Sequence, residues 1–273
     1  MHIWGKIIGF CFGYMFARFP GAILGVIVGH LFDKQYSKAF SGVGGFSGLL
    51  RNKNALKSRA LFFYTLFSIM GHIAKSSGRV TKADIELATL LMAKLNLNKE
   101  LKKEAQAAYT EGKKSDFPIT EVVSEFKRFC AGQKEFIRMY LEIQIQAAVI
   151  NGEIHPKAKQ VLNQIAKVLG YTTEELEALI QQCMASAHFS SGEQSNHYQQ
   201  PTAIQLNNAY QIIGITKDTP EKESKKAYKK LMSQHHPDKL SAQGLPEQAL
   251  LLAKEKTQEI QAAWTLIKQH NTW

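Results

Sequence analysis

The sequence predicts an all-α protein with three parts, namely a membrane-spanning helix, a helical bundle and a carboxy-terminal helical hairpin. Three observations lead to this prediction. An almost wholly apolar run covers residues 7–31. Apolar residues then recur at helical spacing through the middle of the chain. Near the carboxyl end, the tripeptide His236-Pro237-Asp238 stands between a lysine-rich segment and an apolar one.

The composition limits the classes of protein that the chain can belong to. With 273 residues and 45% hydrophobic content it is long enough for about two domains. The formal net charge is +11, but the basic residues are dispersed and no nucleic-acid motif accompanies them. A membrane surface and an acidic protein partner therefore explain the charge better than nucleic acid. Cys11, Cys130 and Cys183 lie far apart, which predicts neither a disulfide framework nor a zinc site.

Residues 7–31 predict a single transmembrane helix. At about 1.5 Å per residue the run reaches about 37 Å, enough to cross a hydrocarbon core of about 30 Å. Arg18 and Pro20 interrupt the run and favour a helix that is tilted, bent or paired with another. A cleaved signal peptide is the alternative, but the run is longer than a usual signal core and no Ala-x-Ala site follows.

The charges around this run predict its orientation in the membrane. Several basic residues follow the run between Lys34 and Arg59, whereas only Lys6 precedes it. We therefore expect residues 1–6 to be a short extracytoplasmic terminus and residues 32–54 a Gly/Ser-rich juxtamembrane linker. The bulk of the chain is then expected in the cytoplasm, at the inner membrane of the cell.

Small residues recur at every fourth position in this region, which predicts that two copies pair in the membrane. Because four residues advance a helix by about 400°, the row drifts about 40° per step, so either its first three or its last three members form the contact. The alternative is that glycine is merely common in membrane helices. The row consists of Gly5, Gly9, Gly13, Ala17, Gly21, Gly25 and Gly29.

Residues 55–188 predict an all-helical bundle, and two similar stretches repeat within it. Each stretch has a helix ended by glycine, a tight turn and a new helix, and the two align Gly78 with Gly152 and Val80 with Ile154. Helical patterns cover residues 61–74, 83–95, 121–129, 133–149, 157–169 and 173–185.

The two halves of this bundle resemble the TerB-like domain, an all-helical module. Turns in that family are often acidic and suspected of metal binding, but here Ser76, Ser77 and Asn151 replace most of the acids. Because a hard cation needs several convergent oxygen ligands, we expect no metal site and no cofactor. A structural turn or a protein-binding surface is the expectation instead. The polar residues 189–205 are expected to be a flexible linker that leaves the following domain mobile.

Residues 206–273 predict a helical hairpin with an exposed tip. Apolar residues four apart end at His235, and lysines fall on the opposite side of a helix expected over residues 221–235. Pro237 is expected to stop that helix, because proline lacks a donor and disfavours helical geometry in the preceding residue. With a second helix expected from about residue 245 to 267, the tripeptide lies at the tip.

The same residues resemble the J domain of the DnaJ family. Residues 208–215 are similar to the first helix of that domain, residues 225–231 to its basic second helix, and residues 258–264 to its third helix. His236-Pro237-Asp238 is the signature of the domain. Two departures are Leu240, where the family often has asparagine, and Thr257, where it often has phenylalanine.

This resemblance implies a co-chaperone that binds a DnaK-type ATPase chaperone and stimulates its ATP hydrolysis. The tripeptide is the implied trigger, and the second helix is the implied basic contact surface. Two simpler explanations are that a lysine row is a solvated helix face and that a His-Asp pair in a turn is a cap. The implied contact residues are Lys225, Lys226, Tyr228, Lys229, Lys230, His236, Pro237 and Asp238.

The order of the three parts resembles that of bacterial membrane-anchored DnaJ-like proteins. The resemblance implies regulation of a DnaK-type chaperone at the inner face of the membrane, with envelope stress signalling among the expected roles. An adaptor or sensor whose TerB-like domain recruits the chaperone to a membrane or signalling protein is the alternative. An enzyme, in the form of a metal-dependent hydrolase, is disfavoured because no nucleophile-base pair or ligand cluster is present.

Overall fold

The computed structural model describes residues 55–150, 153–192 and 202–273. The expected terminus at residues 1–6, the span at 7–31, the linker at 32–54 and the row of small residues all lie outside the described residues. Within the described ranges, no helix combines the length and the apolar composition that a membrane crossing needs. Residues Ser58–Trp273 form one compact unit.

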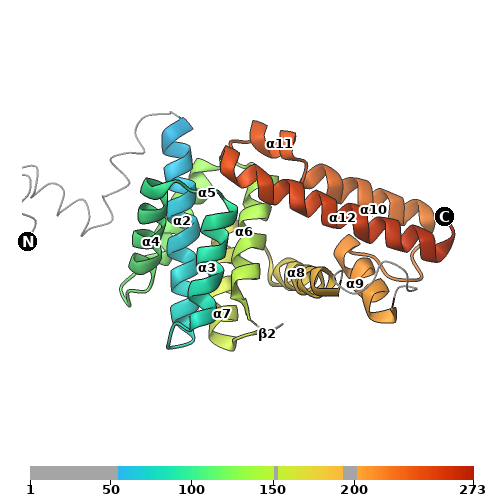
Figure 1. The fold of residues 1–273 in the computed structure, drawn as a ribbon, viewed down its shortest axis with the longest axis horizontal. Helices are drawn as coiled ribbons and strands as arrows, with labels where there is room; N and C mark the ends of the chain where they lie inside the picture. Colours follow the sequence, from blue (N-terminus) through green and yellow to red (C-terminus); the bar gives the residue numbers. More distant parts are fainter. Residues whose placement is uncertain (1–54, 151–152, 193–201) are drawn as a thin grey trace, which may run out of the picture. The chain divides into compact units, whose positions relative to one another are not determined.

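The predicted all-α class is confirmed in this part of the chain (Figure 1). A two-residue ladder between β1 (Val149–Ile150) and β2 (Glu153–Ile154) is the strand pair that the described residues contain. We call α2 to α8 the middle bundle. Its helices are α2 Ala55–Ser76, α3 Lys82–Lys94, α4 Lys99–Gly112, α5 Ile119–Phe129, α6 Lys134–Ala148, α7 Pro156–Leu169 and α8 Thr173–Gly192.

Local side-chain caps mark the starts of α3 and α7 in the bundle. At the start of α3, the Thr81 hydroxyl accepts from the Asp84 N–H and the Asp84 carboxylate accepts from the Thr81 N–H, a capping box. His155 caps α7 and Pro156 occupies its first position, where no N–H is needed. The acid in the first of the two repeated turns therefore caps a helix.

Sequence reasoning missed α4, whose buried face is made of small residues and one tyrosine rather than an apolar stripe. This helix lies very close to α2. A Cβ added at Gly112 would collide with the carbonyl of Ser68, and one added at Gly71 would collide with the carbonyl of Tyr109. Glycine is required at both positions because the two backbones touch.

The central element of the bundle is α6, most of whose residues are buried. Its aromatic side chains join a cluster in which the rings of Phe126 and Tyr140 have centroids 4.1 Å apart. Two of its polar groups bond the backbone of α2: the Tyr140 hydroxyl donates to the Thr65 carbonyl at 3.2 Å, and the Gln144 amide donates to the Leu66 carbonyl at 3.0 Å. These contacts hold the central part of α6 against α2.

The carboxy-terminal segment contains α9 to α12, and Figure 1 shows α10 and α12 lying side by side. Its apolar residues divide between two cores. Leu240, Leu245, Ala249 and Ala253 belong to the core of the middle bundle. Phe189 at the end of α8 instead joins a smaller core built mainly from this segment. The elements are α9 Ala203–Ile213, α10 Glu221–Gln234, α11 Pro237–Ala242, the 3₁₀ turn η2 Glu247–Ala249 and α12 Leu250–Asn271.

The structure corrects two expectations about this segment. Helix α8 continues to Gly192 and α9 begins at Ala203, so both ends of the linker expected at 189–205 are helical, while residues 193–201 lie outside the described residues. The carboxy-terminal segment also packs against α8 and the bundle core rather than standing free. The apolar residues at positions 240–253 explain this, because their burial against the bundle is favourable.

Candidate functional site

His236-Pro237-Asp238 forms the first turn of a short helix rather than a simple stop. Helix α10 ends at Gln234, and Pro237 occupies the first position of α11. Proline holds His236 in an extended conformation, with φ −63° and ψ 124°, which suits a residue just before a helix. The expectation that Pro237 only ends a helix was incomplete, because the same geometry also starts the next one.

The side chains of His236 and Asp238 are both accessible. The Nδ1 atom of His236 accepts from the Asp238 N–H at 3.2 Å, so the histidine caps α11. Its side chain is nevertheless 53% exposed, and that of Asp238 is 92% exposed. Capping of α11 by His236 does not require the Asp238 carboxylate to be so exposed. Both side chains of the tip are therefore accessible to a partner.

The lysines expected to form a basic surface lie along α10. Lys225, Lys226, Lys229 and Lys230 are all exposed. Tyr228 is only partly exposed, and its ring stacks on Trp264 of α12 with centroids 4.9 Å apart and planes 11° apart. The structure therefore gives Tyr228 a role in joining the two helices, next to the exposed lysines.

A group that sequence reasoning missed is Glu135 at the start of α6. The Lys239 ammonium donates to its Oε1 atom at 2.7 Å, and the Gln243 amide donates to its Oε2 atom at 2.8 Å. These two bonds lower the pKa of Glu135 to about 2. The side-chain oxygen Oε1 of Gln243 also accepts from the Phe136 N–H at 3.2 Å. The side chain of Gln243, the residue that follows α11, thus caps the start of α6, whose own N-cap residue supplies no side-chain bond.

His235, on the other side of the tripeptide, points into the junction with the bundle. It is 1% exposed, and its Nε2 atom lies 3.5 Å from Oε1 of Glu142 on α6. Burial lowers the pKa of His235, even though Glu142 acts in the opposite sense, so the ring is neutral at pH 7. The predicted helical row that ends at His235 is therefore correct, and its last member contacts the bundle.

Glu142 belongs to a buried network of charges. Arg138 Nε donates to Glu142 at 2.8 Å and Arg138 Nη2 donates to Gln182 at 2.9 Å. Burial raises the pKa of the Glu142 carboxyl, but the nearby cationic groups hold it below its usual range. Lys256 of α12 donates to Ser186 of α8 at 2.6 Å and pairs with Glu259. Paired in this way, the charges are stabilised despite their burial.

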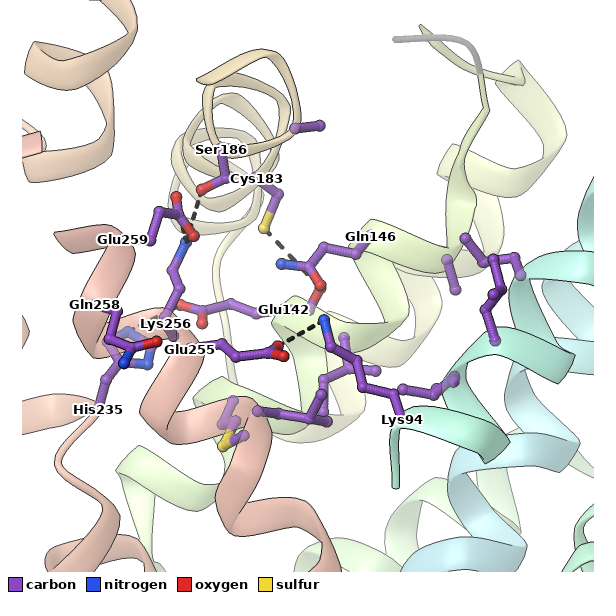
Figure 2. Close-up of a pocket in the computed structure, with 18 of the residues that line it drawn as sticks. Lys94, Glu142, Gln146, Cys183, Ser186, His235, Glu255, Lys256, Gln258 and Glu259 are labelled. Carbon is purple, nitrogen blue, oxygen red and sulfur yellow. Dashed lines mark hydrogen bonds and ion pairs between the residues drawn. The ribbon is translucent and has the colours of Figure 1, made fainter. Parts of the chain in front are cut away.

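A cavity of about 740 Å³ adjoins this network (Figure 2). Its walls come from α2, α3, α6 and α8 of the bundle and from His235 and α12 of the carboxy-terminal segment. Apolar side chains such as Leu87 and Ile143 line it beside the polar groups that Figure 2 labels. Lys94 and Glu255 form an ion pair across its rim at 2.5 Å.

These groups suit binding rather than chemistry. The thiol of Cys183 lines the cavity, but burial raises its pKa to about 12, so it is not a thiolate nucleophile. Within the described residues, no group of three or more His, Cys, Asp or Glu side chains is placed to hold a metal ion. What the site presents is a fixed, exposed tripeptide beside a basic helix.

Comparison with known proteins identifies the domain that carries the tip. Residues 208–272 match the model of the DnaJ domain. The carboxy-terminal segment is therefore a J domain, and the chain is a J-domain co-chaperone.

The remainder of the chain defines the family more closely. Residues 1–42 match the model described as the co-chaperone DjlA transmembrane domain, which marks a membrane-anchored protein. Relatives named co-chaperone protein DjlA are 39% identical in Photobacterium profundum, 40% in Vibrio cholerae and 40% in Escherichia coli, each over 98% of both chains. No solved structure matches the chain. The chain belongs to the DjlA family of co-chaperones.

Proposed function

We propose that the J domain binds a DnaK-type chaperone and stimulates its ATPase. The observation that carries this proposal is the exposure of His236 and Asp238 at the tip, while His235 and Leu240 on either side are buried. Side chains that are fixed by their neighbours and remain exposed are suited to contact another protein. The chain itself supplies no reacting group in this proposal.

Charge on α10 supports an acidic partner surface. The exposed lysines Lys225, Lys226, Lys229 and Lys230, with Lys222 at its start, lie on the helix that leads to the tip. A basic face steers an acidic partner in encounter and sets its register, and the tip then makes the specific contact. In this proposal Lys225, Lys226, Lys229 and Lys230 act mainly on the rate of association, whereas the tripeptide acts on the stimulated rate.

The proposal is tested with the full chain in nanodiscs, by measuring steady-state ATP hydrolysis by the cognate DnaK-type chaperone. The wild-type chain is expected to raise the rate, and His236→Gln and Asp238→Asn are expected to remove that rise. His270→Gln, an exposed histidine on α12, is the matched control and should keep it. A wild-type chain that leaves the rate unchanged, or a fully active His236→Gln variant, would contradict the proposal.

We further propose that a single span holds the chain at the inner face of the cytoplasmic membrane, with residues 1–6 outside. The match of residues 1–42 to a transmembrane domain and the basic residues that follow the apolar run support this orientation. Labelling of single cysteines at residues 2 and 103 with an impermeant reagent in intact cells tests it. Only the first should react from outside.

We also propose that the span forms a homodimer through its small residues. A glycine replaced by leucine in the contact row should separate the helices, since small residues allow close approach. Gly9→Leu and Gly25→Leu test the two halves of the row separately in a membrane dimerisation assay. The proposal fails if neither change weakens association.

A second candidate function is that of an adaptor or sensor, in which the middle bundle binds a membrane or signalling protein and brings the chaperone to it, for example in envelope stress signalling. Exposed apolar side chains on α3, Ile85 at 53% and Leu90 at 68%, favour such a contact. In cells, a His236→Gln variant that still supports the signalling response would favour the adaptor. Loss of the response would favour the co-chaperone.

A further inference from the structure

The tripeptide is held on both sides by the same helix of the middle bundle. His235, directly before it, faces Glu142, and Lys239, directly after it, is paired with Glu135. Glu135 and Glu142 lie seven residues apart on α6, which is about two helical turns, so they project from one face. The two contacts, which we call the brackets, therefore lie on either side of the tripeptide along α6.

The bracket is strongest on the carboxyl side. Glu135 accepts from both Lys239 and Gln243, and Gln243 also accepts from the α6 backbone. Leu240, between these two residues, is 0% exposed and belongs to the bundle core. Leucine at this position departs from the asparagine that is frequent in J domains. The change supplies apolar area that anchors α11 to the bundle.

The bracket on the amino side is buried. His235 and Glu142 are 1% and 6% exposed, and Arg138 holds the Glu142 carboxylate by a bond of 2.8 Å. Because α6 is itself fixed to α2 by buried hydrogen bonds, Glu142 is a rigid neighbour against which the ring of His235 packs, although neither ring nitrogen makes a hydrogen bond. The histidine next to the tip is therefore placed by the bundle and not only by α10.

This arrangement orients the tripeptide without hiding it. His236, Asp238 and the lysines of α10 remain exposed while both brackets are in place. An inhibitory contact would cover these groups. We propose that Glu135 and Glu142 are positioning residues, which hold the His236-Pro237-Asp238 turn in the orientation that a DnaK-type chaperone binds. This proposal rests on the proposed function of the J domain.

Positioning lowers the entropy that binding must remove. A turn that is free to move has to be ordered when the partner binds, whereas a turn already held by α6 does not. Loss of a bracket should therefore raise the concentration of chaperone needed for half-maximal stimulation. It should leave the maximal rate largely unchanged, because the contact groups themselves are retained.

The test uses the full chain in nanodiscs with two readouts, chaperone ATPase stimulation and hydrogen exchange of a peptide that covers residues 237–245. For Glu135→Gln we expect the half-saturating chaperone concentration to rise about three- to tenfold, with a maximal rate within about twofold of wild type. Hydrogen exchange of the peptide should become faster. Glu142→Gln should act in the same direction, and thermal melting shows whether each variant is folded.

Glu177→Gln is the matched control. Glu177 of α8 forms an ion pair of 2.6 Å with Lys159 of α7. The substitution removes one negative charge, as Glu135→Gln does, but leaves both brackets unchanged. Neither readout should change. Asp238→Asn should give the opposite pattern. It should abolish ATPase stimulation but leave the contact between α11 and α6 in place, so hydrogen exchange at the amino terminus of α6 should stay as in wild type.

A charge exchange adds a rescue. Glu135→Lys and Lys239→Glu each break the pair, and the double variant restores it with the charges reversed. The half-saturating concentration of the double variant should return to within about twofold of wild type, as expected for directly paired charges. If each single variant acts and the double variant does not recover, positioning by this pair is wrong.

The remaining outcomes also decide the question. Wild-type stimulation and exchange in Glu135→Gln would falsify the positioning role and leave the co-chaperone function intact. Stronger stimulation by Glu135→Gln would make the bracket inhibitory and overturn the proposal. If the wild-type chain fails to stimulate the ATPase while exchange still responds to Glu135→Gln, the proposed function itself fails and the bracket is only a structural contact.

Discussion

The Nε2 atom of His235 lies 3.5 Å from Oε1 of Glu142, one residue before the exposed His236. The J domain and the middle bundle therefore meet at the part of the J domain that is proposed to act on the chaperone. Adjacent histidines have opposite environments, since one is enclosed by the bundle and the other faces solvent. The contact with α6 is therefore one residue away from the tip.

This buried histidine predicts a loss of stability at mildly acidic pH. Because burial lowers the pKa of His235 in the folded chain, the unfolded chain binds a proton first as the pH falls. The stabilisation is complete above the ordinary histidine pKa of about 6.5 and decreases as the pH falls below it. The charged groups that act on the ring are Glu142, Arg138, Lys256 and Glu259. The pKa of Glu142 is lowered too, but this changes stability only below its usual value of 4.5.

Thermal melting of the full chain in nanodiscs between about pH 7.5 and 5 checks this prediction. The melting temperature of the wild-type chain should fall across this range. His235→Phe, which cannot titrate, should show a smaller fall, although its stability at high pH is allowed to differ. Parallel profiles for the two proteins would show that another group titrates.

Leu240 should contribute strongly to stability. Its side chain is 0% exposed in the bundle core, so Leu240→Ala leaves a cavity and should lower the free energy of unfolding by about 2–5 kcal/mol. Leu240→Asn should be at least as damaging, because the buried amide lacks a partner. Leu251→Ala, at a leucine that is 44% exposed, is the control and should change stability much less. Chemical denaturation measures all three.

The close approach of α2 and α4 predicts that even a methyl side chain at Gly112 is not tolerated. Gly112→Ala should lower the free energy of unfolding by about 1–3 kcal/mol or more, because the new methyl group meets the backbone of α2. The gain in helix propensity, about 1 kcal/mol, is too small to offset a collision with backbone. Ala107→Ser on the exposed side of α4 is the comparison. A Gly112→Ala variant as stable as wild type would mean that the helices lie further apart.

The two buried cysteines should be unreactive in the folded chain. Burial raises the pKa of both Cys130 and Cys183 to about 12, and each side chain is at most 2% exposed. At pH 8, alkylation by iodoacetamide should be about a hundredfold or more slower than in guanidinium, as followed by mass spectrometry of the two peptides. A cysteine introduced at the exposed Lys103 should react quickly in the folded chain. Rapid native alkylation of Cys183 would imply that the junction opens.

Much of the fold is predictable because the helices carry local signals. Apolar periodicity located α5, α6 and α7 within a few residues, and the row ending at His235 correctly gave the buried face of α10. Helix α4 escaped because alanines and glycine bury its face, and such a face has no apolar stripe. Helix α11 escaped because proline was taken only as a stop.

The junction between the bundle and the J domain was not predictable in the same way. Glu135 and Glu142 lie about 100 residues from their partners in the sequence, and no local pattern reports such a contact. One signal was available. Glu142 is an acidic residue inside an otherwise apolar stretch of α6, and a buried acid requires a partner. The departure at Leu240 was likewise visible, but its meaning depends on the tertiary contact.

The cap that Gln243 places on α6 also bears on how the chain is made. The Phe136 N–H bonds a side chain 107 residues further along, and Leu240, Leu245 and Ala253 complete the same core. During synthesis, the first turn of α6 therefore waits for its cap until residue 243 has left the ribosome. A nascent chain arrested before that residue should hold an incomplete bundle with an exposed apolar groove, which is the kind of surface that chaperones bind. The co-chaperone would then be, for that interval, a chaperone client.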